Sequence, residues 1–241
     1  MLKQAHFLFH TDLIDLLPTH RREAEIDVPL NGDQSVKHLI ESLGVPHTEV
    51  GKVLVNGVQV DFSYLVKEGD QVEVYPFFSA GNADIAESVP RFILDNHLGR
   101  LAVYLRMLGF DALYRNDFQD EELAQVCNRE ERILLTRDKR LLMRNLVVRG
   151  YWLRSKIPRR QLEEVVGRFG LAGIAQPFQR CVRCNAPLVL VDKEDILHRL
   201  KPLTRQYYDE FRLCPSCDQV YWKGSHYQRM CQLIEQVLRS A

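Results

Sequence analysis

Four of the six cysteines stand in two C-x-x-C pairs, Cys181 with Cys184 and Cys214 with Cys217. Each such turn can present two thiolates to one ion, and two turns supply the tetrahedral ligand set that structural zinc takes in proteins. The pairs are separated by 29 residues, which exceeds the usual spacing, so we expect the insert to fold as a small helix or loop. Four protein ligands leave no open coordination position, and the predicted zinc therefore supports folding and not catalysis.

Acidic residues that follow apolar runs form a second group of candidate ligands. The run FIL is followed by Asp95, and the run ILLT is followed two residues later by Asp138. If both runs are parallel strands, their carboxyl ends meet at the sheet edge where ligands bind. Asp120 and Glu121 belong to a third acidic group further along the chain. Hard cations favour carboxylate oxygens, so these acids predict a Mg²⁺ or Mn²⁺ site.

An aspartate behind a strand has a second common role, because its side chain can cap the helix that follows. For Asp120 taken alone we expect an N-cap. For Asp138 taken alone, capping and metal binding both remain open. The recurrence of acids behind two strands, with a third acidic group nearby, favours the metal site.

Basic residues surround the second strand end. Arg137, Lys139 and Arg140 are candidates for holding the phosphates of a nucleic acid, and a solvated helix start is the alternative. The charge is also divided along the chain, because residues 1–90 hold 6 Lys and Arg against 14 Asp and Glu, whereas residues 91–241 hold 26 against 18. An acidic module joined to a basic one suggests a phosphate-rich partner.

The elements that must position these residues fall into four consecutive segments. Residues 1–80 alternate as short strands around one helix, which Ser35 caps. Residues 81–90 have the composition of a linker. Residues 91–175 alternate strands and helices, which predicts a mainly parallel α/β sheet covered on both sides. Residues 176–241 hold the cysteine pairs, an aromatic and basic strand, and a helix near 225–240.

The N-terminal segment resembles the β-grasp fold, in the ThiS/MoaD-like branch of ubiquitin-like domains. Sulfur carriers of that branch end in a Gly-Gly tail, whereas this chain continues as FFSAGNADI with Gly81 alone. The resemblance therefore implies a binding or docking role, with a possible protein partner, in place of sulfur transfer. A simply appended domain is the alternative.

The rest of the chain resembles the Mut-seven C-terminal (Mut7-C) RNase family, a branch of the PIN-like nucleases. The segments that carry the resemblance are FILDNHLGRLAVYLRMLGFDALY, RILLTRDKRLL, RCVRCNAPLV and EFRLCPSCDQVYWKGSHYQRM. It implies a PIN-like fold, a zinc ribbon and metal-dependent hydrolysis of RNA phosphodiester bonds. The acids that it carries over are Asp95 and Asp138, with Asp120 as the best match for the middle acid and Glu121 or Glu122 next.

Two classes of function follow. The first is a Mg²⁺- or Mn²⁺-dependent ribonuclease with structural zinc; the second is a non-catalytic RNA-binding or adaptor protein that retains the nuclease fold. Paired acids facing phosphates favour the enzyme. No apolar run approaches the roughly 18–20 residues that span a bilayer, and the N-terminus lacks a signal-peptide core, so we expect a cytoplasmic protein without a membrane partner. The two remaining cysteines, Cys127 and Cys231, are expected in the core.

Overall fold

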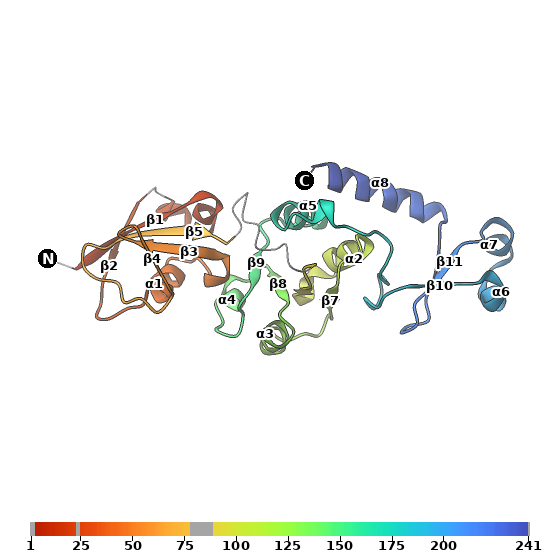
Figure 1. The fold of residues 1–241 in the computed structure, drawn as a ribbon, viewed down its shortest axis with the longest axis horizontal. Helices are drawn as coiled ribbons and strands as arrows, with labels where there is room; N and C mark the ends of the chain where they lie inside the picture. Colours follow the sequence, from red (N-terminus) through yellow and green to blue (C-terminus); the bar gives the residue numbers. More distant parts are fainter. Residues whose placement is uncertain (1–2, 23–24, 78–88, 241) are drawn as a thin grey trace. The chain divides into compact units, whose positions relative to one another are not determined.

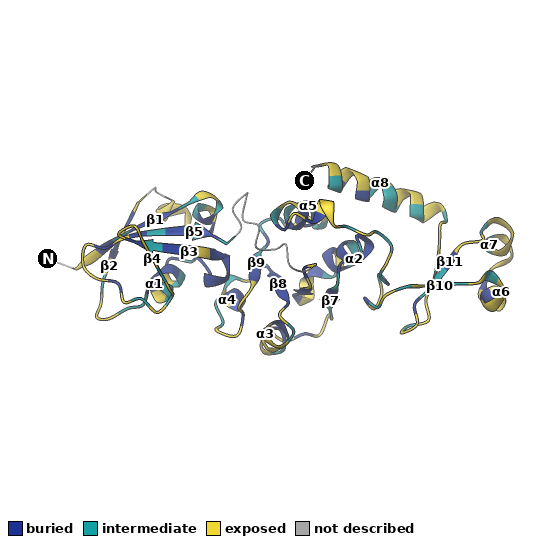
Figure 2. Cartoon of the chain, in the orientation of Figure 1, coloured by how far each residue is buried: buried dark blue, intermediate teal, exposed yellow. Residues whose placement is uncertain are grey.

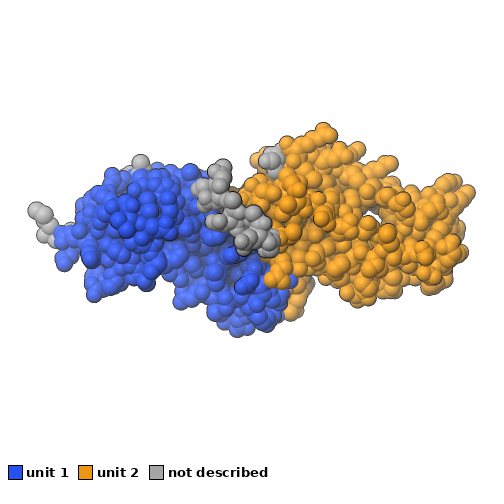
Figure 3. Space-filling view, in the orientation of Figure 1, with its two compact units in different colours: residues 1–84, 119–152 blue, residues 85–118, 153–241 orange. Residues whose placement is uncertain are grey.

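A computed structural model describes residues 3–22, 25–77 and 89–240. The chain divides into two compact units (Figure 3): unit 1 joins Met1–Asp84 to Gln119–Trp152, and unit 2 joins Ile85–Phe118 to Leu153–Ala241. Each unit thus combines two separate stretches of sequence, and the four consecutive domains expected from the sequence remain a prediction. Gly81 and most of the expected linker, up to residue 88, lie outside the described residues.

The N-terminal part of unit 1 is a five-stranded sheet with one helix (Figure 1). The strand order is β2-β1-β5-β3-β4; β1 and β5 run parallel, and the other neighbours are antiparallel. This arrangement confirms the expected β-grasp domain. Its elements are β1 (Gln4–Phe9), β2 (Ile26–Pro29), α1 (Val36–Ser42), β3 (Val50–Val55), β4 (Val58–Val60) and β5 (Gln71–Pro76).

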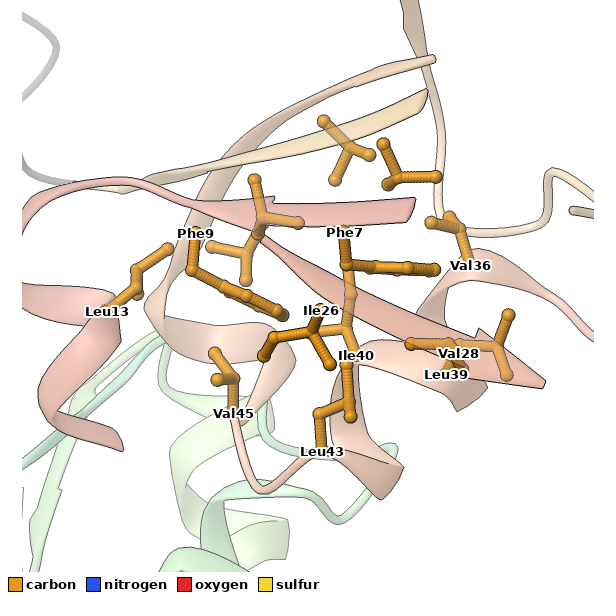
Figure 4. Close-up of a cluster of buried hydrophobic side chains, with 14 of the residues drawn as sticks. Phe7, Phe9, Leu13, Ile26, Val28, Val36, Leu39, Ile40, Leu43 and Val45 are labelled. Atoms are coloured by element: carbon orange, nitrogen blue, oxygen red, sulfur yellow. The ribbon is translucent and has the colours of Figure 1, made fainter. Parts of the chain in front are cut away.

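The core of this domain is built from alternate residues of the strands and from one apolar face of the helix. Alternate residues of β1 point inward, and Phe7 and Phe9 are buried. Helix α1 buries Leu39 and Ile40 against the same face (Figure 4). Burial of each such side chain contributes about 1.5–3 kcal/mol, which makes this cluster the main source of stability for the domain.

Turn and cap residues set the limits of these elements, and the predicted cap at Ser35 is confirmed. The amide of His38 donates to Ser35 Oγ at 3.2 Å, so Ser35 is the N-cap of α1. Gly44 follows the helix with φ +95°. Asn56 and Gly57 have φ values of 51° and 80°, which suit the tight turn between β3 and β4.

The second sheet of the chain is four-stranded and mainly parallel, as predicted. In unit 2, β6 (Phe92–Leu94) pairs in parallel with β7 (Ala112–Tyr114); in unit 1, β8 (Ile133–Thr136) pairs in parallel with β9 (Gly150–Trp152). Every residue of β6 and β8 is buried, which explains their continuous apolar runs (Figure 2).

Four helices accompany these strands: α2 (Gly99–Met107), α3 (Asp120–Arg129), α4 (Lys139–Leu142) and α5 (Pro158–Arg168). The expectation that Asp120 caps α3 is wrong. Gln119 is the N-cap residue, with extended backbone, and Asp120 is already the first helical residue. An acid in the first turn still favours the helix, because it faces the positive end of the helix dipole.

Gly109 ends α2 for a reason that the structure makes explicit. Its φ is +95°, and a Cβ atom there would overlap the carbonyl oxygen of Gln176. The amide of Gln176 in turn donates to Leu108 O at 3.0 Å, so the chain leading to the cysteine module packs closely against the end of this helix. Glycine is therefore required both by the turn and by the close approach.

The cysteine module in unit 2 is a small antiparallel sheet with the order β10-β11-β12. Its strands are β10 (Val189–Val191), β11 (Phe211–Leu213) and β12 (Val220–Trp222), and its insert forms α6 (Lys193–Ile196) and α7 (Pro202–Tyr207). The insert thus folds into short helices, as expected. Helix α8 (Ser225–Ser240) follows and packs against α5.

Short 3-10 helices connect several of these elements: η1 (Thr11–Leu16), η2 (Thr19–Arg21), η3 (His47–Glu49), η5 (Asn96–Leu98), η6 (Leu171–Gly173) and η7 (Leu197–Arg199). Throughout the described part of the chain, none of the helices combines the length and the apolar character needed to cross a bilayer. The cytoplasmic location itself stays a prediction.

Candidate metal centre and nuclease site

The four predicted cysteine ligands come together in unit 2. Their Sγ atoms all lie within 4.8 Å of one another, with 3.5 Å between Cys181 and Cys217 and 3.3 Å between Cys184 and Cys214. Each close contact joins a cysteine of one pair to a cysteine of the other, so both turns contribute equally to one centre. Four sulfur donors in a compact cluster fit tetrahedral zinc.

The backbone of the two turns is the same, which explains how each presents its thiols. The amide of Cys181 donates to Ala186 O at 2.8 Å, and the amide of Asn185 donates back to Cys181 O at 2.9 Å. The second turn has the same two hydrogen bonds. The amide of Cys214 donates to Gln219 O, and the amide of Asp218 donates to Cys214 O, each at 2.9 Å. Asn185 and Asp218 both have positive φ, a conformation that Asn and Asp tolerate well.

The electrostatics of the cluster favour a bound cation. Burial alone would raise the pKa of Cys181, but hydrogen bonds from the Tyr221 hydroxyl and from the Cys184 and Arg183 amides lower it to about 6. Burial raises the pKa of Cys184 to about 12, and the neighbouring sulfur atoms add to this effect. Thiolates packed this closely repel one another, so all four ionise together only around a metal ion.

Two polar side chains attach the first turn to the α/β part of unit 2. Arg106 of α2 is buried, and its guanidinium donates to Val182 O and Arg183 O, both at 3.1 Å, and to Ala112 O at 2.9 Å. Asn185 Oδ1 accepts from the amide of Ala112 at 3.0 Å. The metal turn and strand β7 are therefore held by one hydrogen-bond network.

Asp95 follows β6 in unit 2 and is 5% exposed. Its Oδ1 accepts from the amide of Asn96 at 2.6 Å and lies 3.4 Å from His97 Nδ1, so the carboxylate turns the chain into η5. Asn96 is held in place as well, because its carbonyl oxygen accepts from the Tyr114 hydroxyl at 2.7 Å. The carboxylate is thus fixed at the C-terminal end of a buried strand.

Asp138 follows β8 in unit 1 and is exposed. Its Oδ1 accepts from the amide of Arg140 at 2.8 Å, which makes it the N-cap of α4, and its own amide donates to Thr136 Oγ1 at 2.9 Å. Capping, one of the two roles left open by the sequence, is therefore observed. It uses one oxygen of a carboxylate that has several acceptor positions, so the metal-binding role remains compatible with it.

The two candidate middle acids share a basic neighbour. Arg144 donates to Glu121 at 2.7 Å, and its other terminal nitrogen lies 3.7 Å from Asp120 Oδ2. Both acids are exposed, and the pairs therefore contribute little stability. Arg144 nevertheless brings the start of α3 and the residues after α4 together within unit 1.

The three candidate phosphate contacts are in different surroundings. Arg140 is exposed, whereas Lys139 donates to Leu16 O of the β-grasp domain and its ammonium lies 4.6 Å from the centre of the Trp152 ring. Arg137 is partly buried, and its carbonyl oxygen accepts from Trp152 Nε1 at 3.0 Å. Their role in RNA binding stays a prediction.

Two models of protein families match this chain. Residues 90–234 match the Mut7-C RNAse domain, and residues 2–82 match the Mut7-C ubiquitin domain. The first match covers more than half of the chain. The chain belongs to the Mut7-C RNase family. The comparison with curated proteins gave no match.

The Mut7-C assignment confirms the resemblance inferred from the sequence, including the ubiquitin-like domain in front of the RNase domain. Contacts between that domain and the residues around β9 were missed by sequence reasoning. The amide of Trp152 donates to Glu49 Oε1 at 2.6 Å, and His47 Nε2 lies 2.9 Å from Val147 O. Glu49 is 1% exposed, yet no pattern in its neighbourhood distinguishes it from a surface acid before the fold is known.

Proposed function

We propose that this Mut7-C family member is a divalent-metal-dependent ribonuclease that hydrolyses RNA phosphodiester bonds. The family match supports a nuclease role, and one structural observation carries the metal proposal. Asp95 and Asp138 each stand at the C-terminal end of a buried strand in a mainly parallel sheet. This edge is where α/β sheets bind ligands, so each carboxylate is in a position suited to a metal ligand.

In this proposal Asp95 and Asp138 hold Mg²⁺ or Mn²⁺, with Asp120 or Glu121 as a further ligand. The carboxylate oxygens suit either ion. When bound, the metal supplies Lewis-acid stabilisation of the phosphate charge and lowers the pKa of a coordinated water. Arg137 and Arg140 hold the RNA backbone, whereas Lys139 remains bound to the ubiquitin-like domain through Leu16.

Substitutions that separate capping from metal binding test the proposal. Asn caps a helix about as well as Asp, so Asp95→Asn and Asp138→Asn should keep the fold. Loss of a metal ligand should lower Mn²⁺-dependent cleavage of a mixed-structure RNA by at least about 100-fold. The exposed carboxylate Asp33 provides the matched control, and Asp33→Asn should cleave at the wild-type rate.

Equal cleavage by the wild type and both site variants would identify a contaminating nuclease and remove the enzyme proposal. Binding of RNA without cleavage by any preparation would support the non-catalytic alternative. A comparison of Asp120→Asn with Glu121→Gln identifies the middle acid. We expect the larger loss for Asp120, because Arg144 holds Glu121 more tightly.

We assign zinc in the four-cysteine centre to folding, since its ligand set is complete without substrate. We also place the protein in the cytoplasm, because none of its six cysteines forms a disulfide in the structure and four of them are suited to zinc, as in proteins of a reducing compartment. The ubiquitin-like domain is proposed to serve as a docking module for a protein partner, in addition to its contacts with the residues around β9.

A further inference from the structure

A cavity of about 320 Å³ lies beside the cysteine centre in unit 2, outside the group of acids proposed for catalysis. Its walls come from the ribbon strands, from the segment before the first cysteine turn, and from the start of α8. The lining residues that matter for the argument are Phe178, Tyr221, Trp222, Tyr227, Arg212 and Lys223.

Aromatic rings form much of this cavity. Phe178 and Tyr227 pack against each other with ring centroids 4.6 Å apart, so they make one continuous wall. Trp222 is 41% exposed, which is a large exposed area for an indole. The indole lies close to Gly224, since a Cβ atom at that glycine would be 2.9 Å from Trp222 Nε1. The indole of Trp222 thus offers an accessible aromatic face at the end of strand β12.

The charged residues of the cavity are mostly cationic. Arg180, Arg212 and Lys223 line it against one carboxylate, Glu210. Lys223 forms an ion pair with Glu210, and Arg180 lies 3.7 Å from Asp111 Oδ2, so the excess of positive charge comes from Arg212. Arg212 donates to a neutral partner, Gln179 Oε1, at 2.9 Å, and the neighbouring carboxylate Glu210 already forms an ion pair with Lys223, so Arg212 can still attract an anion.

We propose that this cavity binds an unpaired nucleobase of single-stranded RNA, with the base stacked on Trp222 and the adjoining phosphate near Arg212. The proposal rests on the ribonuclease function above and adds a substrate subsite to it. Every nucleobase has a face that stacks on an aromatic ring, and arginine pairs with phosphate. The volume lies at the lower end of the 300–1,000 Å³ range of ligand pockets, which suits one base and not a duplex.

The metal centre supports one wall of the subsite. Tyr221 lines the cavity, and its hydroxyl lies 3.1 Å from Cys181 Sγ. In the register of the ribbon, Arg212 lies opposite Tyr221, and Trp222 lies opposite Phe211, so paired strands hold all four of these cavity-lining residues. The subsite is therefore a rigid part of the module, and it requires an intact cysteine centre.

Substitution of the exposed indole tests the proposal on the full-length protein. The dissociation constant of a fluorescent 12-nucleotide oligouridylate is measured by anisotropy without added Mg²⁺ or Mn²⁺, so that binding is separated from cleavage. Trp222→Ala should weaken binding by about 5- to 100-fold, the range found when one stacked base loses its aromatic partner. Trp222→Phe should stay within about threefold of the wild type, because a stacking face remains.

A second aromatic residue of the ribbon provides the matched control. Tyr207 is 66% exposed and does not line the cavity, so Tyr207→Ala should bind as the wild type does. Arg212→Gln should weaken binding and reduce its dependence on salt, since one phosphate contact is lost. Equal affinities of Trp222→Ala and the wild type, or an equal loss in Tyr207→Ala, would overturn the proposal.

Fluorescence and competing ligands separate the sources of binding. Stacking should quench the Trp222 emission, so the oligomer should quench the wild type more strongly than Trp222→Phe. A duplex of the same sequence should compete poorly, because its paired bases cannot stack on Trp222; effective competition by the duplex would contradict a base pocket.

The catalytic proposal and the subsite fail in different ways. Asp95→Asn should lose cleavage and keep the affinity for the oligomer, whereas Trp222→Ala should lose affinity and still cleave when RNA is saturating. If Asp95→Asn cleaves normally while Trp222→Ala binds weakly, the catalytic assignment is wrong and the subsite stands. If Asp95→Asn loses cleavage while Trp222→Ala binds as the wild type does, the subsite is wrong and the catalytic assignment stands.

Discussion

Arg106→Met would test how strongly the cysteine module is attached to the α/β part of unit 2. Arg106 is 4% exposed, and its guanidinium serves three carbonyl oxygens, of Ala112, Val182 and Arg183. Burial lowers the pKa of Arg106, while the nearby Cys181 and Cys184 oppose that shift. Methionine keeps the apolar stem of the side chain but donates to none of the three acceptors.

The expected loss follows from those acceptors. An unsatisfied buried carbonyl costs about 1–3 kcal/mol, and Ala112 O is in the buried position. The oxygens of Val182 and Arg183 are partly buried, so water can replace some of their interaction. We expect a total loss of about 2–5 kcal/mol in the free energy of unfolding of the zinc-loaded protein, together with faster loss of zinc to a chelator.

Denaturant titration measures the free energy of unfolding, and a colorimetric chelator measures the rate at which zinc is lost. Arg100→Met is the control, because Arg100 lies on the same helix and is exposed, with its guanidinium carbon 5.8 Å from the centre of the Tyr104 ring. This control should stay within about 0.5 kcal/mol of the wild type. If Arg106→Met matches the control in both measurements, the network does not hold the module.

Three shorter predictions concern the cysteines and one glycine. Cys214→Ser should lose its zinc and become insoluble; a soluble, folded, metal-free variant would contradict a structural metal. Burial raises the pKa of Cys127 to about 11, so iodoacetamide should label it far more slowly than Cys231 at pH 8, with a rate that rises toward pH 11. Equal labelling of the two thiols by mass spectrometry would contradict this burial. Gly109→Ala should destabilise the protein by at least about 2 kcal/mol in denaturant titration, whereas Gly173→Ala, which has open space around it, should be nearly neutral.

Local signals in the sequence were sufficient for most elements. Ser35, the Asn56-Gly57 pair and Gly109 act through their own backbone and side chains, and each marks a cap, a turn or a helix end. The continuous apolar runs of β6 and β8 identified both strands to within a residue. The C-x-x-C pairs predicted the metal centre because their spacing encodes the turn that presents the thiols.

Tertiary relations were harder to obtain from the sequence. The position of Asp120 was missed by one residue, because Gln119 is the N-cap residue without a capping side chain. Cys231 was expected in the core but is only partly buried, since α8 has a wide exposed face; Cys127 is buried as predicted. The buried acid Glu49 and the cavity at Trp222 depend on residues more than 30 positions apart, which periodicity does not reveal.

The contacts of the ubiquitin-like domain have a practical consequence for truncated versions of this chain. The amide of Trp152, the carbonyl of Val147 and the ammonium of Lys139 all find partners within the first fifty residues. A shortened chain that begins at the RNase domain would leave these groups to solvent and uncover β9. Lower activity of such a fragment would then reflect a damaged scaffold, and it would give no measure of control exerted by the missing domain.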